Sequence, residues 1–227
     1  MLSRFFYFLM DNNSPQELKL SFKGEFYRKL LHISSSSIPI GYYFLDKDIV
    51  LSILVPIAFA MLMVEIFKYK SKFIFTTYLR FFKHMLRNHE IDRNKFRVNG
   101  ATWLLIGDVI AIIFFPKLIA VTGMLLLSLA DSFSGIVGRL YGKKEYAPNR
   151  TYIGSLTFLA VGLIIAFAAP KYNYSWIEYL IAAITVIITT IVDGMNLPTD
   201  DNFAIPIVSS ALLYVLYMIF FPGIFAG

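Results

Sequence analysis

LADSFSGIVGRLYGKKEYAPNRTYIGS, residues Leu129–Ser155, is the most unusual stretch of the chain. It begins inside an apolar run that carries one carboxylate, Asp131, and it leaves that run through a short basic loop. An ionisable side chain within a membrane-spanning segment is costly to bury and by default marks a functional site. The stretch therefore predicts a site where an apolar helix leaves a membrane and enters a cationic loop.

The composition predicts an integral membrane protein. Apolar residues make up 57% of the 227 positions and charged residues only 16%, and the charges lie between long apolar runs. The net charge is +6, but the cations flank apolar runs as they do in cytoplasmic loops, so we expect no nucleic-acid partner. The chain contains no cysteine, which excludes disulfides, thiolate metal sites and cysteine nucleophiles.

Seven apolar runs cross, or nearly cross, the thickness of a bilayer. They span residues 30–45, 49–67, 101–115, 118–137, 153–169, 176–192 and 203–221. We therefore expect an all-α fold, a polytopic bundle of about seven transmembrane helices, with residues 30–227 forming a single catalytic domain. An amphipathic arm, residues 1–29, precedes this domain, and a basic, aromatic segment at 68–97 is expected to lie on the membrane surface.

The distribution of Lys and Arg predicts the orientation. The N-terminal arm and the loops after the second and fourth runs are rich in Lys and Arg, whereas each loop between them carries a single lysine. This pattern places the N-terminus and the predicted site in the cytoplasm. Together with the lack of a recognisable cleavable signal, it suits a prokaryotic plasma membrane. Loop 193–202 is an exception among the predicted inner loops, because it has three aspartates and no cation.

In this topology the unusual polar groups collect on the cytoplasmic face. Asp131 lies within two turns of the inner end of its helix, on the same side as Asp193 and Asp201 of the acidic loop. The other polar groups on this face are Arg28, Lys29, His32, Asn99, Thr102 and Asp200. Carboxylates hold a hard cation through oxygen, and Lys and Arg neutralise phosphate oxygens. The combination therefore indicates a site for a magnesium–polyphosphate complex.

Small residues follow Asp131 along one helix face. Ser134, Gly135, Gly138 and Gly142 recur three, four, seven and eleven positions after it. Such a face allows a second backbone or a ligand to approach closely. Helix packing alone is a sufficient explanation for the glycines, but it does not explain the acid and the basic exit together.

At these residues the chain resembles the CTP-dependent lipid-alcohol kinases, which include dolichol kinase, phytol kinase and CTP-dependent diacylglycerol kinase. These enzymes are related to the phosphatidate cytidylyltransferases. The matching segments occur in the family's order and extend over most of the chain. They are RKLLHI (Arg28–Ile33), NGATWLLIG (Asn99–Gly107), LADSFSGIVGRLYGKK (Leu129–Lys144), NRTYIGS (Asn149–Ser155) and DDNFAIPIVS (Asp200–Ser209).

The resemblance implies CTP as phosphoryl donor and Mg²⁺ as cofactor. The expected CTP- and phosphate-binding residues are Lys29, Asn99, Gly138, Arg139, Gly142, Lys143, Asn149, Arg150, Thr151, Gly154 and Ser155. The expected metal ligands are Asp131, Asp193, Asp201 and Asn202. Asp131, Asp201 and His32 remain alternative catalytic residues for the role of base, because a loose transition state makes little demand on a base. Ser134, Arg150 and Asp193 stand where the family more often has alanine, lysine and glutamate.

The favoured function is transfer of the terminal phosphoryl group of CTP to a membrane lipid alcohol of the polyprenol, phytol or diacylglycerol type. A cytidylyltransferase that forms a CDP-lipid is the alternative reaction, although the compact length favours the kinase. A third possibility is a small transporter whose pathway is lined by Asp131 and Asp108. Asp108 could equally be hydrogen-bonded within the bundle. Neither the alcohol nor the oligomeric state follows from the sequence.

Overall fold

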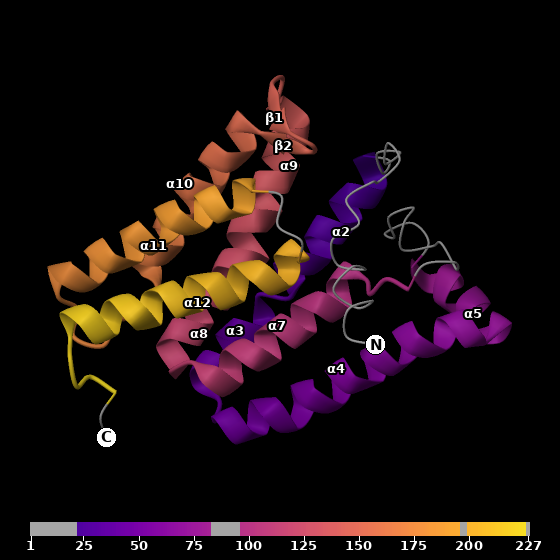
Figure 1. Cartoon of the computed structure of the whole chain (residues 1–227), viewed down its shortest axis with the longest axis horizontal. Helices are drawn as coiled ribbons and strands as arrows, with labels where there is room; N and C mark the ends of the chain where they lie inside the picture. Colours follow the sequence, from indigo (N-terminus) through magenta and orange to yellow (C-terminus); the bar gives the residue numbers. More distant parts are fainter. Residues whose placement is uncertain (1–21, 83–95, 196–198, 226–227) are drawn as a thin grey trace, which may run out of the picture.

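All seven apolar runs are helical in the computed structural model, which describes residues 22–82, 96–195 and 199–225 (Figure 1). Four continuous helices are long and apolar enough to span a bilayer, and two shorter apolar helices accompany them. The long helices are α4 (Lys47–Lys70), α8 (Lys117–Leu125) continued by η1 (Leu126–Asp131) and α9 (Ser132–Tyr141), α11 (Trp176–Gly194) and α12 (Asp201–Phe220). The shorter helices are α7 (Gly100–Phe114) and α10 (Tyr152–Ala168). The prediction of an all-α membrane helical bundle is confirmed.

The first apolar run, 30–45, is divided between two helices instead of forming one span. These helices are α2 (Phe22–Ser34) and α3 (Ser37–Phe44). At the break, Ser34 and Ser35 donate their hydroxyls to backbone carbonyls of the preceding turn, a local bond that competes with continuation of the helix. Pro39 lies in the first turn of α3, where its missing N–H is tolerated. The serine run therefore interrupts a segment that hydropathy predicts as continuous.

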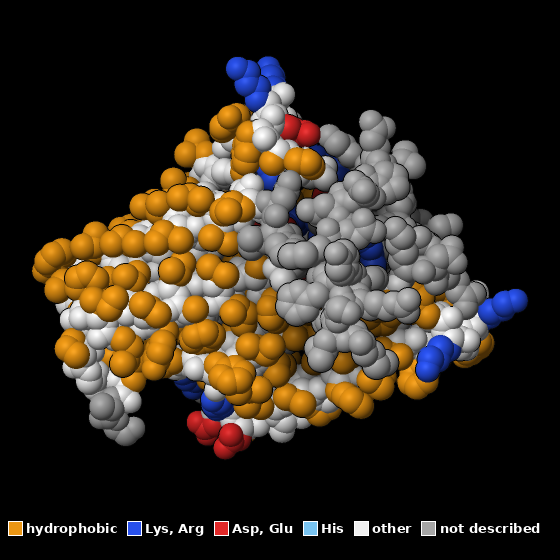
Figure 2. All heavy atoms as spheres, in the orientation of Figure 1, with side chains coloured by type: hydrophobic (Ala, Val, Ile, Leu, Met, Phe, Trp, Pro, Cys, Tyr) orange, Lys and Arg blue, Asp and Glu red, His pale blue; other side chains and the backbone are white. Residues whose placement is uncertain are grey.

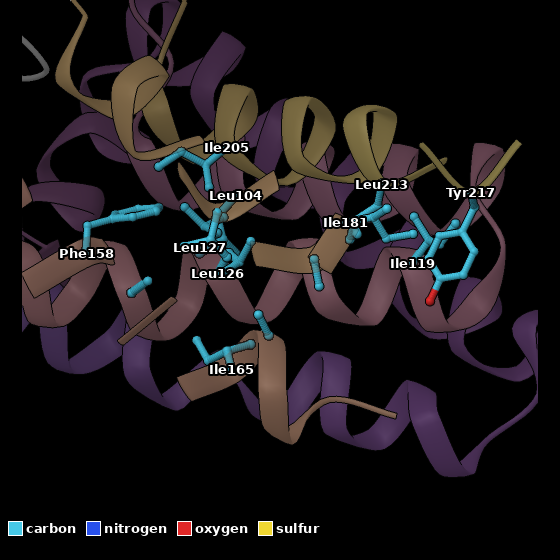
Figure 3. Close-up of a cluster of buried hydrophobic side chains, with 14 residues drawn as sticks. Leu104, Ile119, Leu126, Leu127, Phe158, Ile165, Ile181, Ile205, Leu213 and Tyr217 are labelled. Carbon is cyan, nitrogen blue, oxygen red and sulfur yellow. The ribbon is translucent and has the colours of Figure 1, made fainter. Parts of the chain in front are cut away.

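The helix formed by α8, η1 and α9 runs through the centre of the bundle. Its span is 72% buried, against 22% for the span of α4, which lies at the periphery. Leu126 and Leu127 are fully buried and belong to a core that includes Phe158 of α10, Ile181 of α11 and Ile205 of α12 (Figure 3). Because lipid tails are as apolar as these side chains, close packing holds such helices together more than hydrophobic burial does.

Apolar side chains also cover the outside of the bundle (Figure 2). Phe59 of α4, Ile164 of α10 and Ile219 of α12 are each more than half exposed. An apolar exterior of this extent is unusual for a soluble protein and suits contact with lipid. Charged side chains gather toward the ends of the helices, among them those of the hairpin formed by β1 (Glu145–Ala147) and β2 (Arg150–Thr151) (Figures 1 and 2).

The helix ends alternate between the two ends of the bundle. At one end, which we call the site end, α7, α10 and α12 begin and α11 ends (Figure 1). There Asn202 of α12 donates to a carbonyl at the start of α7, and Arg150, just before α10, bonds Asp193 near the end of α11. At the opposite end, Lys47 of α4 donates to the carbonyl of Ile113 in α7. The relative placement of the helix ends therefore matches the alternating topology predicted from the loops.

The basic segment 68–97 is described in part, and its first cation is not at the surface. α4 continues to Lys70 and α5 (Lys72–Phe82) packs against it. Lys68 is fully buried, 2.6 Å from Oε2 of Glu65 and 4.6 Å from the ring centre of Tyr78. It departs from the expected surface position because an ion pair and an aromatic ring compensate its burial. Residues 83–95 of the segment and 1–21 of the arm lie outside the described residues.

Candidate functional site

A short hairpin brings Arg150 to the acidic loop. Its strands, β1 (Glu145–Ala147) and β2 (Arg150–Thr151), pair antiparallel across a turn in which Asn149 has a φ of 60°, a left-handed conformation that asparagine tolerates. The hydroxyl of Thr151 then caps α10 by accepting from the N–H of Gly154 at 3.0 Å. The family resemblance implies that Asn149 and Thr151 bind phosphate. In the structure they form the turn and the helix cap on either side of Arg150.

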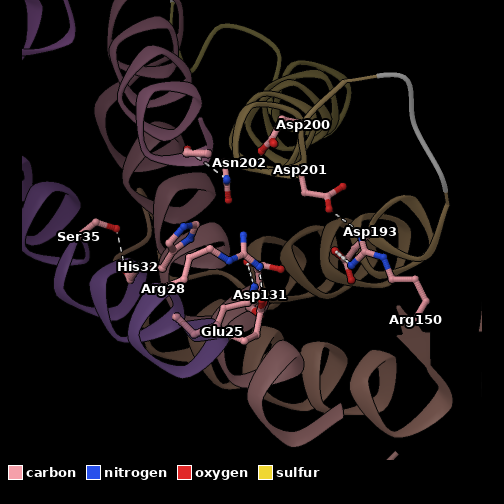
Figure 4. Close-up of polar contacts among 12 residues, drawn as sticks. Glu25, Arg28, His32, Ser35, Asp131, Arg150, Asp193, Asp200, Asp201 and Asn202 are labelled. Carbon is pink, nitrogen blue, oxygen red and sulfur yellow. Dashed lines mark hydrogen bonds and ion pairs between the residues drawn. The ribbon is translucent and has the colours of Figure 1, made fainter. Parts of the chain in front are cut away.

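Arg150 joins two carboxylates from different helices. Its Nη1 donates to Oδ1 of Asp193 at 2.8 Å, and its Nη2 donates to Oδ2 of Asp201 at 2.5 Å (Figure 4). Asp193 lies at the C-terminal end of α11, where the helix dipole disfavours a carboxylate unless a cation is near. Burial lowers the pKa of Arg150, but the two carboxylates outweigh burial and raise that pKa above its ordinary value. The guanidinium therefore stays charged and ties the end of α11 to the start of α12.

Lys29 forms a second ion pair, with Asp131. Its ammonium donates to Oδ2 of Asp131 at 2.6 Å and to the backbone oxygen of the same residue at 3.1 Å. Asp131 is the last residue of η1, a π-helical turn of the kind found frequently at functional sites. Gly135, one turn later, leaves room for the lysine, because a Cβ there would lie 2.4 Å from Cε of Lys29. Asp131 also interacts electrostatically with Arg150, so the two ion pairs form one cluster.

The later glycines of α9 pack against α10 and the hairpin. A Cβ on Gly138 would lie 2.9 Å from Oγ1 of Thr151 and 3.1 Å from Cα of Gly154. A Cβ on Gly142 would lie 2.6 Å from Thr151. These distances leave no room for side chains, so in this structure the glycines serve close helix packing, the alternative that the sequence left open.

Asn99 and Asn202 are engaged with neighbouring helices. Oδ1 of Asn99 caps α7 by accepting from the N–H of Thr102 at 2.8 Å, while its Nδ2 donates to the hydroxyl of Tyr78 at 2.7 Å. Nδ2 of Asn202 donates to the carbonyl of Gly100 at 3.1 Å. Both asparagines therefore join α7 to its neighbours, α5 and α12. Expected as ligands of CTP and metal, they hold the site end together in this structure.

Three further expected residues lie at the edge of the cluster. Arg139 and Lys143 are exposed at the end of α9 and in the loop that follows it. Ser155 shares a hydrogen bond with the hydroxyl of Tyr146 at 2.7 Å. This edge is accessible from water, so a charged ligand could meet it before the buried ion pairs.

The three alternative bases differ in their bonding. The carboxylates of Asp131 and Asp201 are bonded to Lys29 and Arg150. His32 is 4% exposed, and its Nδ1 has no hydrogen-bond partner within the described part of the chain. The two carboxylates are thus each held by a cation through one oxygen, whereas Nδ1 of His32 is buried without a partner among the described residues.

Sequence reasoning missed two buried serines beside Asp131. Ser128 and Ser132 are fully buried, and Ser128 shares a 3.3 Å hydrogen bond with Ser35. Their four-residue spacing, which places them on one helix face, is the signal that could have found them.

Asp108 is expected from the sequence either to line a pathway or to be hydrogen-bonded within the bundle. It is 1% exposed, and neither of its carboxylate oxygens has a hydrogen-bond partner among the described residues.

Oxygen donors in the cluster fit a nucleotide-bound Mg²⁺ better than a metal held by protein alone. No group of three or more His, Asp or Glu side chains in the described residues is arranged to hold a metal ion. Mg²⁺ on a nucleotide, however, needs one or two carboxylates together with phosphates and water. Asp193 and Asp201 meet this need because they converge on one guanidinium.

Comparison with known proteins finds relatives at low identity. The chain is 27% identical over 199 residues to an uncharacterized protein of Rickettsia prowazekii, and the aligned region covers 87% of this chain and 94% of that protein. It is 25% identical over 221 residues to CTP-dependent diacylglycerol kinase 1 of Eremothecium gossypii, covering 86% and 68% of the two chains. It is 24% identical over 135 residues to probable phytol kinase 1, chloroplastic, of Oryza sativa subsp. japonica, covering 53% and 43%. No protein-family model and no solved structure matches the chain.

Proposed function

We propose that this chain, a relative of the CTP-dependent lipid kinases, is an integral membrane enzyme that transfers the terminal phosphoryl group of CTP to the hydroxyl of a long-chain lipid alcohol. The resemblance to that family is confirmed by the relatives named CTP-dependent diacylglycerol kinase and phytol kinase. The observation that carries the proposal is the convergence of Asp131, Asp193 and Asp201 with Lys29 and Arg150 at one end of an apolar bundle.

The proposed reaction converts CTP and an alcohol into CDP and a lipid phosphate. The alcohol oxygen bonds to the γ-phosphorus, the bond from that phosphorus to the β–γ bridging oxygen breaks, and CDP leaves with the electron pair. The hydroxyl proton passes to a base and then to water. Because the transition state is loose, the enzyme contributes mainly by positioning the reactants and neutralising phosphate charge.

The charges of the cluster suit this task. When CTP binds, its phosphates compete with the carboxylates for Lys29 and Arg150, and Asp193 and Asp201 then become available to a cation. Mg²⁺, when bound with the nucleotide, supplies further neutralisation of the phosphate oxygens. The N-termini of α7, α10 and α12 also lie at the site end, and their positive dipole ends favour an anion.

The lipid would reach the site from the bilayer, since the outer surface of the bundle is apolar up to the site end. Leu30 and Leu31 of α2, beside Lys29, are each nearly half exposed. We place the site on the cytoplasmic face, where CTP is available, and the protein in a prokaryotic plasma membrane. The loop charges support this orientation.

A labelling experiment separates the kinase from the cytidylyltransferase. Purified protein in lipid nanodiscs receives Mg²⁺, CTP labelled in either the γ- or the α-phosphate, and either a lipid alcohol (dioctanoylglycerol, phytol or a short polyprenol) or the corresponding lipid phosphate. The kinase transfers only the γ-label to lipid. Transfer of the α-label to a lipid phosphate acceptor would establish the alternative, and a lack of γ-transfer to every alcohol would refute the kinase. Asp131→Asn should abolish transfer, and Asp48→Asn, an exposed acid in the first turn of α4, should leave it unchanged.

A further inference from the structure

Two packed helices at the site carry facing stripes of polar side chains. Lys29 and His32 of α2, and Ser35 directly after its end, recur every three residues. Lys29 contacts Asp131, and Ser35 contacts Ser128, so α2 runs antiparallel to the central helix along this contact. His32 therefore lies between the two contacts, opposite the turn that separates Ser128 from Asp131.

Ser132 belongs to the facing stripe of the central helix. Ser128 contacts Ser35, and a Cβ on Gly135 would meet Lys29, so both positions face α2. Ser132 precedes Gly135 by three residues within α9, which places these two residues on one face of that helix. His32 interacts electrostatically with Asp131, and Ser132 directly follows Asp131, so both residues lie beside that carboxylate.

Both side chains hold polar atoms that lack partners. Nδ1 of His32 and Oγ of Ser132 have no hydrogen-bond partner within the described part of the chain, and the residues are 4% and 0% exposed. Burying a polar atom without a partner is unfavourable, so native proteins rarely keep one without a use. Two such atoms on facing stripes, next to Asp131, indicate a position for a small polar group that both can bond.

The surroundings indicate that this group arrives on an apolar molecule. The helical structure is interrupted between α2 and α3, at Ser35. At membrane depth, non-helical backbone is tolerated where it is buried in protein or lines a cavity. Around the stripe, Leu30, Leu31 and Ser34 are exposed on the outer side of α2. A molecule in the bilayer can therefore approach α2 laterally, while CTP approaches from water.

We propose that His32 and Ser132 together form a pocket that binds the hydroxyl of the acceptor lipid, a long-chain primary alcohol, beside Asp131. The hydroxyl donates to Nδ1 of His32 and accepts from Oγ of Ser132. The inference rests on the proposed kinase function and deepens it, because it selects His32 among the three alternative bases. In the reaction, the hydroxyl proton moves to Nδ1 of His32 as the alcohol oxygen bonds to the γ-phosphorus, and water later takes the proton.

Steady-state kinetics with the full chain in nanodiscs test the pocket. Ser132→Ala should raise KM for dioctanoylglycerol about tenfold, the loss of one hydrogen bond, while KM for CTP stays within twofold. It should not reduce the thermal unfolding temperature, because the wild-type hydroxyl has no partner to lose; a structural role would reduce it. His32→Asn, which keeps an amide near Nδ1, should retain more activity than His32→Leu. Ser52→Ala is the matched control, an exposed serine in α4 away from the site.

A crosslinking experiment distinguishes failure of the pocket from failure of the kinase assignment. A photoreactive long-chain primary alcohol should label peptides from α2 or η1, its methyl ether should label them less, and Ser132→Ala should reduce labelling by the alcohol. This pattern supports the pocket even if no lipid phosphate forms. Equal labelling by the alcohol and its methyl ether would show that this pocket does not bind the hydroxyl. An unchanged KM for the lipid in both Ser132→Ala and His32→Leu would show the same. In either case the kinase function would still be tested separately by the γ-label assay.

Discussion

The ammonium of Lys29 lies 2.6 Å from a carboxylate oxygen of Asp131, although 102 residues separate them in the sequence. Both side chains are only 6% exposed. A buried ion pair contributes little net stability, because desolvation offsets the attraction between the charges. Its presence at the end of a membrane helix is therefore better explained by a need for both charges than by stability.

Removing one partner of this pair should destabilise the protein and abolish activity. Asp131→Asn leaves the Lys29 ammonium buried without a counter-charge, which we expect to cost about 3–5 kcal/mol of unfolding free energy. Adding Lys29→Met to Asp131→Asn should recover most of that stability without recovering lipid phosphorylation. Thermal unfolding in nanodiscs and the γ-label assay measure the two effects. Recovery of activity in the double variant would show that the pair is only structural.

Gly135→Ala should displace Lys29 without unfolding the protein. The new Cβ would lie 2.4 Å from Cε of Lys29, and that flexible side chain can move more easily than backbone. We expect at least a tenfold loss of kcat/KM for CTP, the scale of one charge-assisted hydrogen bond, with a folded protein by circular dichroism. Gly41→Ala, in helix α3 with nothing within 4 Å of the added Cβ, is the matched control and should keep full activity. Wild-type activity in Gly135→Ala would contradict a role for the position of Lys29.

Arg150→Lys should weaken CTP binding and make it sensitive to alkaline pH. A lysine ammonium cannot reproduce the two separate N–H contacts with Asp193 and Asp201. Because the carboxylates raise the pKa of Arg150 against the effect of burial, the arginine keeps its proton, and its contribution to CTP affinity should persist to about pH 10. The lysine variant should lose affinity at lower pH than the wild type, because the ordinary pKa of lysine, about 10.4, lies below that of arginine.

CTP affinity measured across this pH range checks the prediction. Arg80→Lys, the same change at an exposed position of α5, should behave as wild type. An identical decline with pH in the wild type and in Arg150→Lys would assign the titration to another group.

Chelation of Mg²⁺ should stop the reaction reversibly. Excess EDTA should abolish γ-label transfer, Mg²⁺ should restore it, and Ca²⁺ should not, because its longer and more variable coordination suits phosphoryl transfer poorly. Asp193→Asn should raise the Mg²⁺ concentration for half-maximal rate about tenfold. Asp46→Asn, an exposed acid just before α4, should not change it. Full activity in EDTA would remove the metal from the mechanism.

Particular residues show what could be predicted from the sequence. The apolar runs predict helices because a segment in lipid must satisfy its backbone internally, and the loop charges predict which helix ends meet. Asp131 stands out because an acid in an apolar run is costly. The bonding of Asn99 and the burial of Lys68 could not be predicted, since each depends on Tyr78, a residue brought from another helix.

By itself, the sequence determined the membrane class of the protein, its helices and the acidic and basic residues that define the site end, because hydropathy and charge are local properties. Tertiary structure alone decided which charges pair: Lys29 with Asp131, and Arg150 with Asp193 and Asp201. It also decided that Gly138 packs against α10, and that Nδ1 of His32 and Oγ of Ser132 are buried without hydrogen-bond partners in the part of the chain that the structure describes. These relationships depend on distances between helices, which no local pattern of residues encodes.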